Sequence, residues 1–342
     1  MTDRSEGRPA LPVGVGTGIG SMPGESARDA AAVVNGELDL AHLVELPGRG
    51  LGADMIGRMA AILVDLPMDT GTWGYRLAPR GSRLMRRAAD LLREDLDMVE
   101  ELWETAGFVG SGRPFKIQVA GPFTMAASVE LAGGHKVLRD RGAVRDLVDS
   151  GAEGLRNHAD EVSRRLGAQV VVQIDEPLVG DVIDGRIKPL TRFDVIEPVA
   201  VTEVAEALGA MIEQVGRPAI LHNCGRTRWD LVRRLPGVAL SADLTAPTAT
   251  DLDEIGALID RGDVLVAGVV PTTGDRRVHA DAVATGLATL TDRIGLNRKV
   301  LRDNVIVTPT CGLAGASAQW ATTALKISAK AGQLLAGDPT AL

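Results

Sequence analysis

One histidine and two cysteines are the residues of this sequence best suited to metal chemistry. His222 and Cys224 stand two positions apart, so an extended segment would place both side chains on the same side. Cys311 follows a later apolar run, and Asp243 follows the run next to the His-x-Cys segment. Zinc takes tetrahedral ligands from Cys, His and carboxylate, and two thiolates with an imidazole favour it over magnesium or calcium. The pattern predicts a zinc site.

Two alternatives to the zinc site remain. The cysteines could be buried structural thiols beside a core histidine, or they could form a disulfide with each other.

Two other short motifs could bind the charged groups of a small substrate. Asp175-Glu176-Pro177 follows an apolar run, where a carboxylate could accept from a substrate ammonium, act as a general base, or cap the next turn. Ser21 follows Ile19 and Gly20, and such a segment offers backbone N–H groups and a hydroxyl to a carboxylate. An ordinary glycine turn is the alternative interpretation of this second motif.

Short apolar runs alternating with helical patterns must position these residues. The expected strands are residues 13–19, 43–46, 116–120, 169–174, 219–222, 238–242, 264–270 and 305–308, and the main expected helices are 85–104, 143–166, 195–215, 251–261 and 280–294. Nearly continuous apolar runs are typical of strands buried on both faces, which implies a parallel sheet. Strand alternating with helix predicts an α/β fold, a parallel eight-stranded (β/α)8 TIM barrel, over residues 13–342, preceded by a flexible tail at 1–12.

A doubly wound sheet is the competing fold. The evenly spaced Gly14, Gly16, Gly18 and Gly20 would be its best support, but they contain no G-x-G-x-x-G pattern opening a helix. In a barrel, the carboxyl ends of the strands carry the chemistry. Eight strand–helix units in roughly 320 residues favour the barrel, and the candidate residues stand at or directly after the ends of expected strands.

Composition excludes several classes of function. The chain has 342 residues with 37 Lys and Arg against 45 Asp and Glu, a formal net charge of −8, which argues against nucleic acid or an anionic membrane surface as partner. Nine aromatic residues (four Trp, four Phe and one Tyr) are too few for a base-stacking platform. No apolar run approaches the roughly 18 residues of a membrane span. Two cysteines favour a reducing, cytoplasmic compartment.

Taken together, the motifs resemble one known family. The residues on which the resemblance rests are, in chain order, Ile19-Gly20-Ser21, Gly121-Pro122, Ile174-Asp175-Glu176-Pro177, His222-x-Cys224 and Cys311-Gly312. They look like the catalytic C-terminal barrel of cobalamin-independent methionine synthase, over about residues 17 to 330. The resemblance implies zinc-dependent transfer of a methyl group to the thiol of homocysteine. It implies zinc binding by His222, Cys224 and Cys311, with Asp243 where the family has a Glu. It also implies homocysteine binding by Ile19, Gly20, Ser21 and Asp175, with Glu45 where the family has a further amino-acid-binding Glu.

The side of the site that would meet the methyl donor departs from the family pattern. The family has a Trp shortly after Gly-Pro, whereas this sequence continues with Phe123 and Thr124. Where the family has a proton-donating His, this sequence reads Val270-Pro271-Thr272-Thr273, and the family's additional N-terminal barrel is not matched. These departures argue against methyltetrahydrofolate, the donor that the resemblance implies, and favour a methyl-corrinoid or an S-methyl sulfonium or thioether compound, whose leaving group needs no proton. The donor stays open between methyltetrahydrofolate and a methyl-corrinoid. The alternatives are a related methyltransferase acting on another thiol, of the coenzyme M type, and a barrel that binds an amino acid or metal without turnover.

Overall fold

A computed structural model describes residues 11–72, 74–191, 195–274 and 278–342. Residues 1–10 of the predicted tail lie outside this part of the chain. Leu11, which also belongs to the predicted tail, packs against a small apolar cluster together with Val13.

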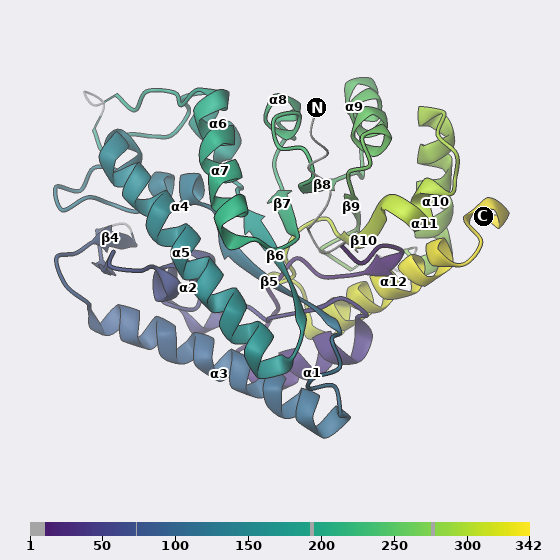
Figure 1. The fold of residues 1–342 in the computed structure, drawn as a ribbon, viewed down its shortest axis with the longest axis horizontal. Coiled ribbons are helices and arrows are strands. Elements are labelled where there is room, and N and C mark those ends of the chain that lie inside the picture. The colour runs from purple at the N-terminus through teal and green to yellow at the C-terminus, as the bar shows by residue number, and fades with distance from the viewer. Residues whose placement is uncertain (1–10, 73, 192–194, 275–277) are drawn as a thin grey trace.

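The fold is an α/β arrangement around a curled, parallel, eight-stranded sheet of the TIM-barrel-like type (Figure 1). Its strands are β1 (Val15–Gly16), β2 (Ala41–His42), β5 (Pro114–Ala120), β6 (Gln169–Asp175), β7 (Ala219–Asn223), β8 (Ala239–Asp243), β9 (Leu265–Val270) and β10 (Val305–Pro309). They lie in the order β1-β10-β9-β8-β7-β6-β5-β2, and every neighbouring pair is parallel. The prediction of an eight-stranded parallel sheet is confirmed. A fully closed barrel stays a prediction.

The two outermost strands of this order, β1 and β2, meet at a seam rather than in a ladder. Just beyond the strand ends, Ser21 and Glu45 form an isolated parallel bridge, in which the Glu45 N–H donates to the Gly20 carbonyl at 3.1 Å. Lower down, the Thr17 hydroxyl donates to the Leu40 carbonyl at 2.9 Å. Two segments expected to bind substrate therefore lie side by side at this seam.

The interior of the curled sheet changes from apolar to polar along the strands. Its floor is a small cluster separate from the main core, formed by Leu40, Val171, Ile220, Ala239, Val266 and Ile306. Residues two apart on a strand share a face, so Gln173 and Asp175 lie above Val171, and His222 lies above Ile220. The polar end of this interior coincides with the carboxyl ends of the strands.

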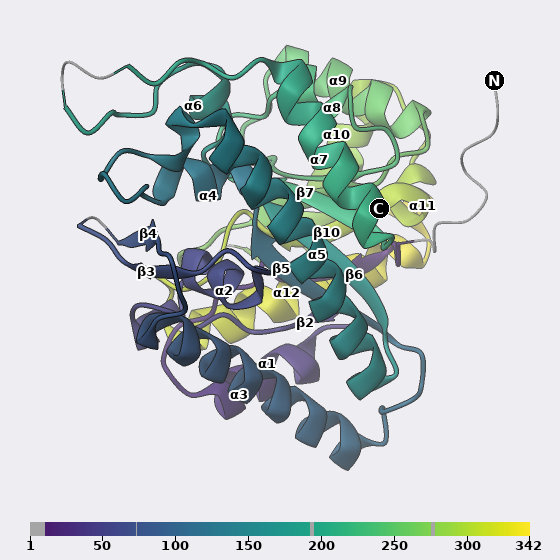
Figure 2. The same ribbon diagram turned by 60° about the vertical axis from the view of Figure 1, so that its left-hand side comes forward.

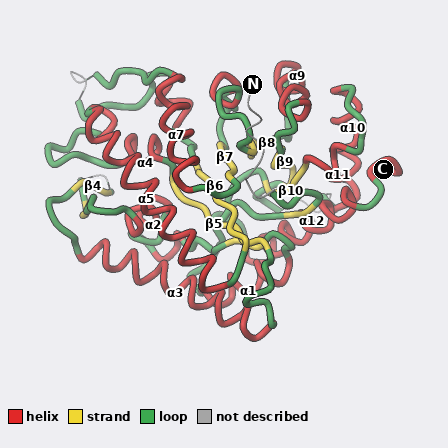
Figure 3. The backbone as a smooth tube through the Cα atoms, in the orientation of Figure 1, coloured by secondary structure: helices red, strands yellow, loops and turns green. Residues whose placement is uncertain are grey.

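Helices cover the outside of the sheet, as the backbone trace shows (Figure 3). They are α1 (Ala27–Glu37), α2 (Met55–Ile62), α3 (Arg83–Ala106), α4 (Pro122–Ser128), α5 (Arg141–Leu166), α6 (Val179–Ile183), α7 (Val201–Val215), α8 (Trp229–Val232), α9 (Ala249–Asp260), α10 (Ala280–Ile294), α11 (Val300–Asn304) and α12 (Ala318–Ala336), with short 3-10 turns at Pro47–Arg49, Val137–Arg139 and Pro339–Ala341. Helices α1, α2 and α3 pack side by side on one flank (Figure 2). No described helix is long and apolar enough to span a bilayer.

The structure corrects some of the expected boundaries. The expected helix at 195–215 begins only at Val201, because Pro198 lacks an N–H and restricts the residue before it. The expected strand at 43–46 pairs instead at Ala41–His42, and Glu45 makes only the isolated bridge. A hairpin of β3 (Met68–Thr70) and β4 (Tyr75–Leu77), together with α1 and α12, was not anticipated.

Two glycines let α12 lie directly on β1. A methyl group at Gly332 of α12 would stand 2.4 Å from the Val15 carbonyl carbon. One at Gly16 of β1 would stand 2.4 Å from backbone atoms of Ser328 and Ala329. Backbone therefore packs on backbone here, with no room for a side chain on either element. This contact holds in place the strand that leads to Ile19, Gly20 and Ser21.

Replacement of Gly332 by alanine is expected to destabilise the protein by about 1–3 kcal/mol, because the added methyl group overpacks the α12–β1 contact. Gly286 of α10 is the matched control, since a methyl group there would meet nothing within 4 Å. Gly286→Ala should stabilise by up to about 1 kcal/mol through helix propensity alone. Urea unfolding of both variants measures the difference, and equal stabilisation by the two substitutions would contradict the close packing.

Candidate active site

His222, Cys224 and Cys311 form a group able to hold a metal ion. Each offers one ligand atom, and these three atoms all lie within 4.8 Å of one another. His222 is buried on β7, Cys224 follows the end of that strand, and Cys311 follows β10. The expected strand ends thus bring together residues that are nearly ninety positions apart in sequence.

The two ring nitrogens of His222 have different surroundings. Its Nδ1 lies 2.9 Å from the hydroxyl of Ser241 on β8, whereas Nε2 is buried and has no hydrogen-bond partner among the described residues. A buried polar atom without a partner costs free energy, so Nε2 is the natural ligand atom of this ring. Ser241 then has the role of the outer partner that fixes the ring orientation of a metal-bound histidine.

The pKa values of the two thiols are shifted in opposite directions. Hydrogen bonding from Cys224, reinforced by His222, lowers the pKa of Cys311 to about 4. The same hydrogen bond, together with burial, raises the pKa of Cys224. The Cys311 thiol is therefore the more acidic of the two. Thiolate is the form of cysteine that binds metal ions.

Asp243, the candidate carboxylate ligand, lies at the exposed end of β8 and is not part of the His222, Cys224 and Cys311 group. Its Oδ1 accepts from the N–H of Thr245 at 2.8 Å and from the Thr245 hydroxyl at 2.7 Å. In the described conformation, one carboxylate oxygen thus closes a local turn. Its role as a fourth ligand stays a prediction.

Ile19, Gly20 and Ser21 follow β1 and lie against the segment that carries Cys311. The N–H of Leu313 donates to the Ser21 carbonyl at 2.9 Å, and a methyl group on Gly312 would meet the Ser21 hydroxyl at 2.1 Å. No acceptor is recorded among the described residues for the N–H of Gly20 or of Ser21. These two amides and the Ser21 hydroxyl are thus available to a ligand next to the metal-binding group.

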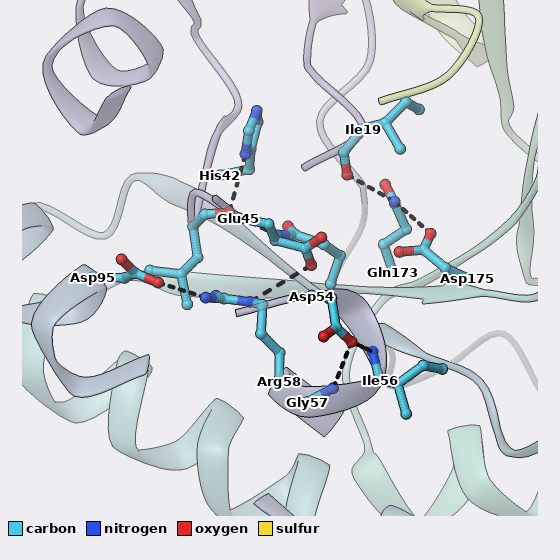
Figure 4. Close-up of polar contacts among 12 residues, drawn as sticks. Ile19, His42, Glu45, Asp54, Ile56, Gly57, Arg58, Asp95, Gln173 and Asp175 are labelled. Carbon is cyan, nitrogen blue, oxygen red and sulfur yellow. Dashed lines mark hydrogen bonds and ion pairs between the residues drawn. The ribbon is translucent and has the colours of Figure 1, made fainter. Parts of the chain in front are cut away.

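Glu45 lies across the seam from Ser21 and is buried. Its Oε1 has no hydrogen-bond partner among the described residues, and the nearest cation is Arg58, whose Nε is 3.7 Å away (Figure 4). Arg58 also bonds the fully buried Asp95, and Asp54 caps the start of its helix, α2. Burial raises the pKa of Glu45, against the opposing effect of Arg58. Because no described residue donates a hydrogen bond to it, Glu45 Oε1 can still accept one from a further cationic group.

The adjacent carboxylates of Asp175 and Glu176 have different tasks. Glu176 accepts from the N–H groups of Phe123 and Thr124 and from the Thr124 hydroxyl, at 2.7–2.9 Å, and so caps the start of α4. Asp175 is the register partner of His222 on the neighbouring strand, which places it beside the metal-binding group. Burial raises the pKa of both carboxyl groups. Glu176 therefore caps a helix that precedes it in the chain rather than the turn that follows its own strand, while Asp175 faces the site.

Three buried polar residues beneath the site were missed from the sequence. Lys116 and Gln118 lie on β5 and Gln173 on β6, all at positions of the interior face. Gln118 donates to the Leu43 carbonyl at 2.6 Å, and its buried Oε1 has no hydrogen-bond partner in the described part of the chain. The available signal was a polar residue at every second position within otherwise apolar runs: Lys116-x-Gln118 and Gln173-x-Asp175.

The fold and site together define a class of protein, a parallel α/β enzyme fold with a metal-binding group at the carboxyl ends of its strands. The model of the family "Cobalamin-independent synthase, Catalytic domain" matches residues 15–333. The chain belongs to the catalytic-domain family of the cobalamin-independent methionine synthases, which are methyltransferases. The family resemblance seen in the sequence is confirmed.

Solved structures share the fold at low sequence identity. One is a B12-independent methionine synthase from Shewanella sp. W3-18-1 in complex with selenomethionine, at 13% identity and a TM-score of 0.59, covering 96% of this chain and 100% of that one. Another is a methyltransferase from Methanosarcina mazei, at 16% identity and a TM-score of 0.54, covering 94% of each chain. A comparison with curated proteins found no match.

Replacement of Ser241 by alanine is expected to weaken zinc binding by about 10- to 100-fold, because His222 loses the partner of its Nδ1. A chelator-competition titration of the folded protein measures this affinity. Ser328→Ala removes an equally buried hydroxyl that donates to the Ala324 carbonyl within α12, and should leave zinc affinity unchanged. Equal affinities for the two variants would show that Ser241 does not orient the ligand.

Proposed function

We propose that this protein transfers a methyl group to the sulfur of homocysteine to form methionine. The observation that carries the proposal is the group of His222, Cys224 and Cys311 next to Ser21, with unpartnered donors and acceptors for an amino acid around it. A thiol-bearing amino acid could reach the metal-binding group with its sulfur while its charged end stays at the seam between β1 and β2.

The donor set fits zinc. A buried imidazole nitrogen without a partner and two thiols, all within 4.8 Å of one another, match the ligand types of zinc sites. We propose His222, Cys224 and Cys311 as ligands, with Asp243 as the fourth through its remaining carboxylate oxygen. A zinc ion bound there would lower the pKa of a coordinated thiol, so that the acceptor sulfur is a thiolate nucleophile at neutral pH.

The rest of the site would hold the amino-acid end of the substrate. The N–H groups of Gly20 and Ser21 suit a carboxylate, because neither has a backbone acceptor among the described residues, and the Ser21 hydroxyl belongs to the same segment. Asp175 and Glu45 suit the ammonium group, since both carboxylates are buried and Glu45 Oε1 has no hydrogen-bond partner there. Charged hydrogen bonds in such a buried site are strong, and they would fix the orientation of the attacking sulfur.

The methyl donor we propose is methyltetrahydrofolate or a methyl-corrinoid. Phe123, which stands near the position of the family's Trp, is buried within α4 rather than presented to a donor. The segment after β9 reads Pro271-Thr272-Thr273 and supplies no histidine there. A donor whose leaving group needs no proton fits this segment better, which favours the corrinoid. Assays with both donors decide between them.

The first test is the metal content of the purified protein. About one zinc per chain is expected, with zinc lost in both Cys224→Ser and Cys311→Ser, because each variant removes a thiolate ligand. Elemental analysis by mass spectrometry measures the stoichiometry, and Asp243→Asn measured in parallel reports on the fourth ligand. A protein prepared without chelator that neither contains nor takes up zinc would refute the thiolate mechanism.

The second test concerns the acceptor. Asp175→Asn should lower kcat/KM for homocysteine by about 10- to 100-fold, because the ammonium group loses a charged hydrogen bond. Activity toward 2-mercaptoethanesulfonate, which has no ammonium group, serves as the internal control and should change little. If that thiol is the better substrate of the unaltered protein, the coenzyme M type of activity replaces the homocysteine proposal. If zinc and homocysteine bind but neither donor gives turnover, a binding function is favoured.

A further inference from the structure

A buried lysine lies beneath the segment proposed to bind the substrate carboxylate. Lys116 is fully buried, and its Nζ donates to the Ile19 carbonyl at 2.9 Å and to Gln173 Oε1 at 2.8 Å. Among the described residues, no carboxylate oxygen lies within the 4.0 Å of an ion pair with this ammonium group. A buried charge is costly, and here its hydrogen bonds go to a backbone carbonyl and an amide.

The Gln173 side chain completes a clamp on the same carbonyl. Its Nε2 donates to Ile19 O at 2.8 Å and to Asp175 Oδ1 at 2.7 Å (Figure 4). Both lone pairs of the Ile19 oxygen are therefore occupied, one by an ammonium and one by an amide. The same amide connects this carbonyl to the carboxylate proposed to bind the substrate ammonium.

The clamp determines the direction of the next N–H group. The described peptide bonds are all trans, and in a trans peptide the C=O and N–H point to opposite sides. Because the Ile19 carbonyl points toward Lys116 and Gln173, the Gly20 N–H of that peptide points away from them. Gly20 has φ +154°, and a methyl group on it would meet the Gln118 side chain at 2.7 Å, so the segment has little freedom to turn.

We propose that Lys116 and Gln173 are positioning residues that aim the Gly20 amide at the substrate carboxylate. Through its bond to Asp175, Gln173 also sets the distance between the two binding points of an α-amino acid. The inference rests on the proposed function, because it assigns the amide segment to the carboxylate of that substrate. The two residues do not touch the substrate, and their effect is on recognition rather than on methyl transfer.

The decisive variant is Lys116→Met, which keeps the length of the side chain and removes its two donated bonds. The KM for homocysteine should rise about 10- to 100-fold, the loss expected for poorly aimed hydrogen bonds to a charged group, with kcat within about threefold. Zinc content should stay unchanged. Thr291→Val is the control, because it removes a buried hydroxyl on α10 that donates to the Leu287 carbonyl, and it should change none of these quantities.

Binding probes separate the two ends of the substrate without turnover. Isothermal titration with L-methionine, with 4-(methylthio)butanoate, which lacks the ammonium group, and with 3-(methylthio)propylamine, which lacks the carboxylate, is carried out on the zinc-loaded protein. Lys116→Met should weaken the first two and not the amine. Gln173→Glu is nearly isosteric and keeps the acceptor for Lys116 but loses both donated bonds. It should therefore weaken all three probes, and it serves as the second test if Lys116→Met does not fold.

The outcomes distinguish this inference from the proposed function. If the unaltered protein binds L-methionine and both variants retain its affinity within about twofold, the clamp has no positioning role. If both variants lower kcat at unchanged KM, the residues act on the transfer step and the inference is wrong. If the unaltered protein binds none of the three probes, the proposed amino-acid substrate itself is wrong, whatever the variants do.

Discussion

The interior of the curled sheet must be filled, and how this chain fills it determines most of its other features. A barrel-like sheet usually packs branched apolar side chains inside, and here such residues form only the floor. Above the floor stand Lys116, Gln173 and His222, each buried. Polar groups removed from water need partners, so each neighbouring strand must supply a carbonyl, amide or hydroxyl at the matching height. The register of the sheet and the arrangement of the site both follow from this need to pair buried polar groups.

This requirement explains why chemically similar neighbours have different roles. Asp175 and Glu176 are adjacent acids, yet the Glu176 carboxylate bonds the start of α4, whereas Asp175 faces inward beside His222. Likewise, the two thiols differ in acidity because each is the other's main neighbour. The identity of a residue in the sequence gives its possible chemistry, while the direction of its side chain decides which part of that chemistry is used.

The sequence was sufficient to predict most of the eight parallel strands and the proximity of His222, Cys224 and Cys311, for a physical reason. Strands buried on both faces must be apolar on most positions, and residues directly after them must gather at one end of the sheet, as His222, Cys224 and Cys311 do. Lys116 and Gln173 escaped notice because a charged or amide side chain is rarely buried and is normally assigned to the surface. The late start of α7 and the β3–β4 hairpin depend on local backbone limits and tertiary pairing that hydrophobic periodicity does not report.

The seam between β1 and β2 has a consequence for how substrate and fold depend on each other. Along most of the sheet neighbouring strands share continuous ladders, but these two strands share a single bridge between Ser21 and Glu45. The proposed substrate would place its carboxylate on the Ser21 side and its ammonium on the Glu45 side. It would then connect the two neighbouring strands that are least well paired, and the connection would be lost when it leaves. Substrate binding would then stabilise the fold at this seam, and release of the product would remove that stabilisation.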